Sequence, residues 1–130
     1  MQFKTVTILA VCANMLTACS PSPKSVVEDF YQHISDGKIE QAMALIDMKQ
    51  TASMGLSEGK MRQAMASQSE KLNNIKCGGI KEVNIKNEEV RGDLAIITYE
   101  VICKSGLKPT PASKEHLIKV DGKWLITVKF

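Results

Sequence analysis

The positions of apolar residues divide this chain into a helical half and a sheet half. From about residue 23 to residue 75, apolar side chains recur every three or four positions, which is the spacing of one face of an α-helix. After Gly78 and Gly79 they alternate with polar side chains, which is typical of half-buried β-strands. A block of helices followed by a block of strands predicts an α+β domain whose helices pack on one antiparallel sheet.

Three helices are predicted in the first half. The first begins after Ser22, whose hydroxyl can cap it, and ends at Gly37. The second covers residues 38–48 and the third covers residues 57–74. The buried stripe of the third helix is expected to comprise Met61, Met65, Leu72 and Ile75.

About four strands are predicted in the second half, the first beginning at residue 83 and the others covering residues 94–103, 113–120 and 123–130. Residues 94–103 are apolar on both faces, which favours a central place in the sheet. Asp121 and Gly122 suit a two-residue hairpin between the last two strands. The alternation of the last strand places Trp124, Ile126, Val128 and Phe130 inward and Lys123, Thr127 and Lys129 outward.

A different pattern precedes the domain. One cation, Lys4, is followed by an apolar run over residues 6–15, which is too short to span a bilayer but is typical of an export signal. The run leads into residues 16–19, Leu-Thr-Ala-Cys, which resemble the lipobox of bacterial lipoproteins. In a lipobox the small side chains admit a membrane peptidase, and the cysteine thiolate attacks a diacylglycerol donor. The alternatives are an ordinary secretory signal and a buried apolar strand that ends in cysteine.

The resemblance to a lipobox implies a signal peptide over residues 1–18, a lipidated Cys19 with a tether over residues 19–23, and one domain over residues 24–130. Removing the signal, which includes Cys12, leaves 112 of the 130 residues. That length supports one modest core and is too short for two domains. Ser20 after the cysteine favours sorting to the outer membrane, by analogy with lipoproteins of double-membrane bacteria. We therefore expect a periplasm-facing lipoprotein held by acyl chains such as palmitate.

Charge argues against nucleic acid as a partner. The chain has 17 basic and 14 acidic residues, and losing Lys4 leaves a balance of +2, which is too small for a nucleic-acid surface. Acidic residues dominate residues 24–47, whereas lysines dominate the chain from residue 104 onward. This asymmetry fits two solvated faces. The alternative is a basic sheet edge turned toward anionic lipid or cell-wall groups.

Local motifs in both halves carry a second resemblance. They are a first helix over residues 26–31, a glycine corner at residues 36–38, the start of the sheet at residues 79–81, a Gly-Asp strand start at residues 91–97, and an Asp-Gly hairpin before Trp at residues 120–124. Together they resemble the uncharacterised bacterial lipoproteins with a nuclear transport factor 2-like (NTF2-like), or cystatin-like, domain. The resemblance implies a curved sheet that wraps around the helices and leaves a conical pocket. It implies a fold and no activity, because relatives of this fold include enzymes, ligand binders and interaction or immunity modules.

The predicted cone offers few groups for catalysis. Enzymes of this fold such as ketosteroid isomerases use an aspartate base with tyrosine or aspartate donors inside the cone. Here the positions expected to face inward are apolar, with no acid among them: Ala95, Ile97, Val101, Trp124 and Ile126. Tyr31 and Tyr99 alone offer pocket hydroxyls, so the candidate pocket residues are Tyr31, Tyr99 and Trp124, and we expect no catalytic residue. We expect Trp124 itself to serve the core and not to act as a ligand platform.

No metal or other cofactor is expected. Met61 and Met65 lie one helical turn apart, and thioether sulfur suits Cu(I). Both residues also fall on the buried stripe of the third helix, which favours a packing role. His33 and His116 are single histidines without a ligand-like partner in the sequence, so neither indicates a metal site.

Cys77 and Cys103 are predicted to form a disulfide. If the first two strands pair with Val83 beside Ile97, the same antiparallel register places Cys77 opposite Cys103. The exported compartment is oxidising, and these are the two thiols left after cleavage and lipidation. One alternative is a pair of buried free thiols. Another is a bulge at the two glycines that follow Cys77, which would turn its side chain to the wrong face.

The function predicted from the sequence is therefore general. We expect a membrane-anchored lipoprotein whose domain is a non-catalytic ligand-binding or protein-interaction module, with an unknown protein or a small apolar ligand as its partner. The alternative is a small pocket enzyme of the isomerase or dehydratase type. Polar, titratable groups lining the cone would favour the enzyme, and a dry or closed cone would exclude it.

Overall fold

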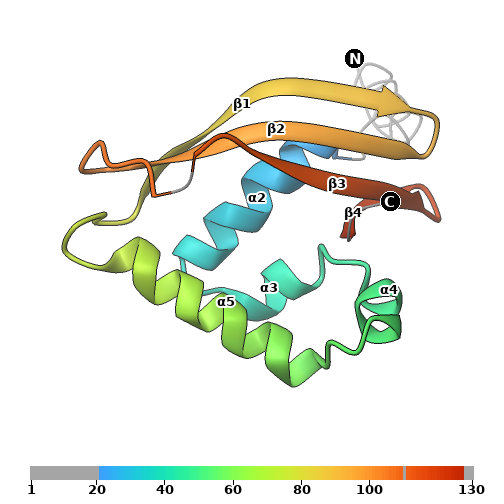
Figure 1. The fold of residues 1–130 in the computed structure, drawn as a ribbon, viewed down its shortest axis with the longest axis horizontal. Helices are drawn as coiled ribbons and strands as arrows, with labels where there is room; N and C mark the ends of the chain where they lie inside the picture. Colours follow the sequence, from blue (N-terminus) through green and yellow to red (C-terminus); the bar gives the residue numbers. More distant parts are fainter. Residues whose placement is uncertain (1–20, 110, 128–130) are drawn as a thin grey trace, which may run out of the picture.

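The computed structural model describes residues 21–109 and 111–127, and in these ranges helices pack on one face of a four-stranded antiparallel sheet (Figure 1). The helices are α2 (Pro23–Ser35), α3 (Ile39–Met43), α4 (Met48–Ser53) and α5 (Glu58–Asn73). The strands are β1 (Ile80–Arg91), β2 (Leu94–Cys103), β3 (Ser113–Val120) and β4 (Lys123–Thr127), in the spatial order β1-β2-β3-β4. The predicted α+β class, with its helices before its strands, is confirmed.

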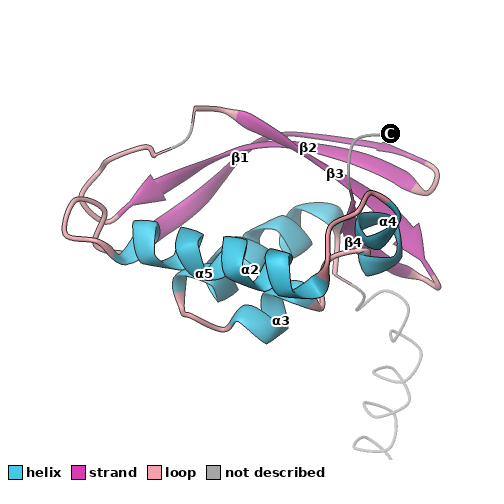
Figure 2. Ribbon diagram, turned by 60° about the horizontal axis from the view of Figure 1, so that its bottom comes forward, coloured by secondary structure: helices cyan, strands magenta, loops and turns pink. Residues whose placement is uncertain are grey.

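Helix α2 occupies the centre of the domain. The Ser22 hydroxyl caps it by accepting a hydrogen bond from the Ser25 amide at 3.3 Å, and Pro23 takes the first helical position. The helix contacts β1, β2 and β4 as well as α3 and α5, and this enclosure fully buries Val27 and Ile34. Figure 2 shows the two layers that result, with the sheet on one side and the helices on the other. The core lies between them.

The predicted helix over residues 38–48 is wrong beyond Met43, because α3 ends there and α4 begins only at Met48. Helix α3 is short because the chain then extends and Ile46 forms a parallel bridge with Ile126 of β4. The Asp47 amide donates to the Ile126 carbonyl at 2.8 Å, and the Ile126 amide donates to the Leu45 carbonyl at 2.7 Å. These backbone groups are therefore bonded to the sheet, and the helix resumes only as α4.

Helix α5 matches its predicted bounds. Its predicted buried stripe is correct except at the last apolar position, Ile75. Ser57 caps the helix, and Met65 and Leu72 are buried as expected. Ile75 was expected in the same stripe, but its residue is 98% exposed. The prediction for Ile75 is wrong because the backbone leaves the helix in an extended conformation at Asn74, so the helical spacing no longer applies.

The predicted register of the first hairpin is wrong. Val83 pairs with Val101 and not with Ile97, and Ile80 pairs with Cys103. The strand β1 continues through polar residues to Arg91, and two irregularities in the ladder shift its register further. An edge strand with polar side chains on both faces gains little from any one register, so its sequence specifies the pairing weakly.

The disulfide between Cys77 and Cys103 is present, although the pairing that predicted it is not. Cys77 precedes β1, and the ladder partner of Cys103 is Ile80. Gly78 and Gly79 both have positive φ, at 73° and 98°, which folds the chain back and brings the two cysteine Cα atoms to 4.9 Å. The glycines that could have turned Cys77 away therefore bring it to its partner.

The last hairpin confirms the predicted turn at residues 121–122 and the burial of Trp124. Thr127 was expected to face outward, but it is buried and its hydroxyl donates a hydrogen bond to the side-chain carbonyl of Gln50 on α4. The outward prediction is wrong because α4 covers this end of the strand. Residues 128–130, the predicted end of the strand, lie outside the described residues.

The predicted signal peptide, Cys19 and the first residues of the tether also lie outside the described residues. Within residues 21–109 and 111–127, no helix is both long and apolar enough to cross a membrane.

Candidate functional site

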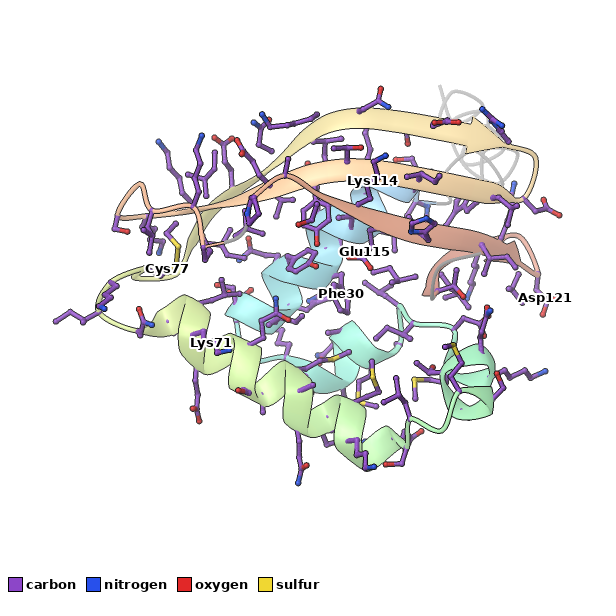
Figure 3. The ribbon with its side chains drawn as sticks, in the orientation of Figure 1. Phe30, Lys71, Cys77, Lys114, Glu115 and Asp121 are labelled. Atoms are coloured by element: carbon purple, nitrogen blue, oxygen red, sulfur yellow. A yellow bond between two sulfur atoms is a disulfide. The ribbon has the colours of Figure 1, made fainter. Side chains whose placement is uncertain are left out.

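A pocket of about 400 Å³ opens between the helices and the β3–β4 side of the sheet. Its apolar wall comprises Phe30, Ile46, Leu56, Met61 and Ile126. Tyr31 and Glu115 contribute polar groups to the same pocket. Figure 3 shows Phe30 on α2 and Glu115 on β3 beside the space between the two layers. The pocket therefore combines a mainly apolar wall with a polar end.

The polar end is a cluster of three side chains from three elements, namely Tyr31 of α2, Tyr99 of β2 and Glu115 of β3, which we name the Tyr-Tyr-Glu cluster. The two tyrosine hydroxyls are hydrogen-bonded to each other, and the ring centroids lie 5.0 Å apart. The Tyr31 hydroxyl donates to Glu115 Oε2 at 3.1 Å. The Tyr99 hydroxyl lies 3.3 Å from the same oxygen and can donate to it.

Local periodicity brings each member of the cluster to the inner face. Tyr31 follows Val27 by one helical turn and so faces the sheet with it. Tyr99 lies on the inner face of β2, between positions that are fully buried. Glu115 precedes the fully buried Leu117 by two residues on β3, and alternation therefore directs both toward the helices.

Burial controls the ionisation of the cluster. It raises the pKa of the Glu115 carboxyl above its ordinary value, although the hydrogen bonds from both tyrosines act in the opposite direction. Burial and then the nearby Glu115 charge raise the pKa of Tyr99 to about 12. The same two causes raise the pKa of Tyr31 further. Both hydroxyls therefore keep their protons at neutral pH, and Glu115 is easier to protonate than an exposed glutamate.

The expectation that no acid lies among the inward positions is wrong, because Glu115 is one. That expectation considered the inward positions of β2 and β4. It did not assign which residues of β3 face inward. The signal was available: counting back two residues from the apolar Leu117 reaches Glu115.

The structure brings together two of the three predicted pocket residues. Tyr31 lines the pocket, and Tyr99 is hydrogen-bonded to it and to Glu115. Trp124 is not among the residues of the pocket wall. It is 9% exposed and belongs to the core near the β3–β4 turn, where the Lys119 ammonium lies 5.7 Å from its ring centroid.

The residues considered as metal ligands are dispersed. Met61 is in the pocket wall, whereas Met65 is buried in the core. His116 also lines the pocket, and His33 lies in the last turn of α2. Over the described ranges, no group of three or more His, Cys, Asp or Glu side chains is placed to hold a metal ion.

Another carboxylate, which is buried, lies on the opposite face of the sheet. Glu100 of β2 accepts a hydrogen bond from the Asn84 side-chain amide at 3.3 Å. The Lys108 and Lys86 ammonium groups lie 3.4 Å and 3.7 Å from the same oxygen. The hydrogen bond from Asn84, and then the two lysines, hold the pKa of Glu100 below its ordinary value.

Comparisons with known proteins place the chain in a family. Residues 17–127 match the family described as a domain of unknown function, DUF4878. A search of curated proteins finds no match.

Solved structures support the fold. An NTF2-like protein from Campylobacter jejuni, provisionally described as a transpeptidase, has 23% identity and a TM-score of 0.67, over 84% of this chain and 100% of the other. A SEC-C motif containing protein from Rhodopseudomonas palustris has 10% identity and a TM-score of 0.56, over 82% of this chain and 75% of the other. At these identities the likeness concerns the fold alone. The chain therefore belongs to the DUF4878 family and has an NTF2-like fold.

Proposed function

We propose that this protein is a bacterial envelope lipoprotein whose cone is a non-catalytic binding module for a small, mainly apolar ligand. The observation that carries the proposal is the pocket of about 400 Å³, whose apolar wall ends at the Tyr-Tyr-Glu cluster. A concave apolar pocket with a few convergent polar groups is the usual form of a small-molecule site. We expect the half-buried Glu115 carboxylate to orient such a ligand.

The membrane part of the proposal rests on residues 16–19. Helix α2 begins at Pro23, so the tether after Cys19 is about four residues and spans no more than about 15 Å. A diacyl or triacyl anchor is effectively permanent, at about 0.8 kcal/mol per buried methylene. We expect the wild-type protein to stay with the membrane after washing, sorted to the outer membrane and facing the periplasm.

The anchor is tested with Cys19→Ala. The variant should lose its acyl mass and leave the detergent phase, whereas Cys77→Ala should keep both properties. An acyl group that persists on the Cys19→Ala chain would rule out the lipoprotein assignment.

The pocket is tested by closing its mouth. Leu56 is exposed and belongs to the pocket wall, so Leu56→Trp should reduce binding of the apolar fluorophore N-phenylnaphthylamine by about tenfold or more without lowering the melting temperature. Leu107→Trp is the matched control, because Leu107 is similarly exposed but lies in the β2–β3 connection, away from this pocket. Equal binding by the wild type and both variants would contradict the pocket as the site.

Glu115 also supports the alternative of a small pocket enzyme of the isomerase or dehydratase type. A carboxylate whose pKa is raised by burial can act as a general base or acid near neutral pH. The test is isomerisation of an unconjugated cyclohexenone by the purified protein. Turnover that disappears in Glu115→Gln would favour the enzyme, and absence of turnover in the wild type favours the binding module.

A further inference from the structure

The carboxylate of Glu115 has one oxygen with hydrogen bonds and one without. Oε2 lies within hydrogen-bond distance of both tyrosine hydroxyls, at 3.1 Å and 3.3 Å. Both hydrogen bonds that Glu115 accepts within residues 21–109 and 111–127 fall on Oε2. A carboxylate can accept about four hydrogen bonds. Glu115 is half-buried and lines the pocket, so Oε1 is the acceptor that a ligand at this polar end can use.

The hydroxyl protons of the cluster already take part in hydrogen bonds within it. Tyr31, Tyr99 and Glu115 make three mutual contacts, and the two tyrosines supply only two protons for them. A proton on Glu115 Oε2 would complete the third contact. While Glu115 is ionised, the hydroxyl protons serve contacts within the cluster, and Oε1 is an acceptor.

Two basic residues flank Glu115 on β3 and line the rim of the same pocket, namely Lys114 and His116. Lys114 is exposed, and alternation along the strand directs its side chain away from Glu115. The other titratable groups that meet Glu115 are the hydroxyls of Tyr31 and Tyr99, from α2 and β2. The donor that satisfies Oε1 has to come from outside the cluster.

We propose that the pocket selects alcohols, that is, apolar molecules whose polar head is a hydroxyl that donates a hydrogen bond to Glu115 Oε1. This inference rests on the proposed binding function and names the ligand class for that same pocket. A ketone, an ether or a carboxylate would place an acceptor against an acceptor, which leaves both without a hydrogen bond. The cluster thus differs from an oxyanion hole, which requires hydroxyl protons directed at the ligand.

The test uses three probes of nearly equal shape: ethylnaphthalene, methoxynaphthalene and naphthylmethanol. The last two are constitutional isomers, so they differ in hydrogen-bond donation and not in atomic composition. Binding of each to the purified protein is measured by calorimetry. Naphthylmethanol should bind about tenfold more tightly than methoxynaphthalene, which is the discrimination expected from one hydrogen bond to a carboxylate.

Variants assign the preference to one side chain. Glu115→Met keeps the length of the side chain without a carboxylate, and it should bind the two isomers equally. Glu100→Gln is the matched control, because Glu100 is buried on the other face of the sheet, and it should keep the wild-type preference. A preference that survives in Glu115→Met would overturn the assignment to Glu115.

Measurements on the wild-type protein alone distinguish failure of the proposed binding function from failure of the proposed selection of alcohols. Failure of all three probes to bind would overturn the proposed binding function together with this inference. Binding of ethylnaphthalene and methoxynaphthalene that equals or exceeds that of naphthylmethanol would overturn only the selection of alcohols.

Discussion

Each face of the sheet holds a glutamate that is shielded from solvent, Glu100 buried and Glu115 half-buried, and the two sites are built in opposite ways. On the outer face, Glu100 is surrounded by an amide and two ammonium groups, from Asn84, Lys86 and Lys108. On the inner face, Glu115 meets only the neutral hydroxyls of two tyrosines. The pKa of Glu100 is lowered and the pKa of Glu115 is raised. For Glu115 burial outweighs the two tyrosine hydrogen bonds that lower the pKa, whereas for Glu100 the amide and ammonium partners outweigh burial.

We interpret the Glu100 site as structural and the Glu115 site as the proposed ligand site. The charge of Glu100 is compensated within the sheet, so its neighbours account for its presence. Glu115 has no ammonium or amide partner comparable to those of Glu100 among the described residues, and it lies in the wall of a pocket. This arrangement is expected of a group that binds a ligand. The comparison predicts that changes on the inner face affect core stability or ligand binding, and that matched changes on the outer face leave ligand binding unchanged.

The largest expected effect is on stability. Trp124 is in the core of the inner face, so Trp124→Ala should lower the free energy of unfolding by about 3 to 5 kcal/mol. Leu94, which shares the outer face with Glu100 and is partly exposed, should lose about 1 kcal/mol or less when changed to alanine. Urea denaturation measures both. Equal losses would contradict the assignment of the core to one face.

The disulfide should have a somewhat smaller effect. It joins the inner-face end of β2 to the loop before β1 across a separation of 26 residues, for which loop-closure entropy gives about 3.5 kcal/mol. The double variant Cys77→Ala, Cys103→Ala should lose about this amount at equilibrium. Thiol labelling of the unfolded, unreduced wild type provides the control, since it should find no free thiol among the mature residues. Two reactive thiols would refute the bond.

The smallest effect is the most specific to the two glutamates. Because the pKa of Glu115 is raised in the folded state, its contribution to stability is largest below the unfolded pKa of about 4.3 and is lost as pH rises through the folded pKa. Glu100 has a lowered pKa, so its contribution is present above the unfolded pKa and is lost as pH falls through the folded pKa. As pH rises, the ionisation of Glu115 should therefore lower the free energy of unfolding, whereas the ionisation of Glu100 should raise it.

Melting temperatures of a glutamine variant at each glutamate, measured between about pH 4 and about pH 8, test these opposite effects. Relative to the wild type, Glu115→Gln should become more stable as pH rises from about 4 to about 8. Glu100→Gln should become less stable over the same interval. Shifts of the same sign in both variants would show that the two carboxylates are not differently paired.

Local signals in the sequence predicted most of the fold. Ser22 and Ser57 cap their helices as expected, and the last hairpin turns at residues 121–122. These features depend on a few adjacent residues. The early end of the predicted second helix could not be predicted from adjacent residues. It results from the bridge between Ile46 and Ile126, which are far apart in the sequence.

The candidate site was only partly predictable for a related reason. The register of β1 was misjudged because its polar second half carries no burial pattern that fixes the pairing. The disulfide was nevertheless right, since the oxidising compartment and the thiol count argued for it independently of register. Tyr31 and Tyr99 were identified as pocket hydroxyls, whereas Glu115 was missed because the inward positions of β3 were not assigned.

The central claim is that Glu115, and not Glu100, meets the ligand. Carbon NMR of the glutamate side-chain carboxyl groups during titration with naphthylmethanol tests it directly, because each carboxyl resonance responds to its own hydrogen bonds. The Glu115 resonance should shift in proportion to the bound probe while the Glu100 resonance stays in place. A bound probe that leaves the Glu115 resonance unmoved, or that moves the Glu100 resonance equally, would contradict the claim.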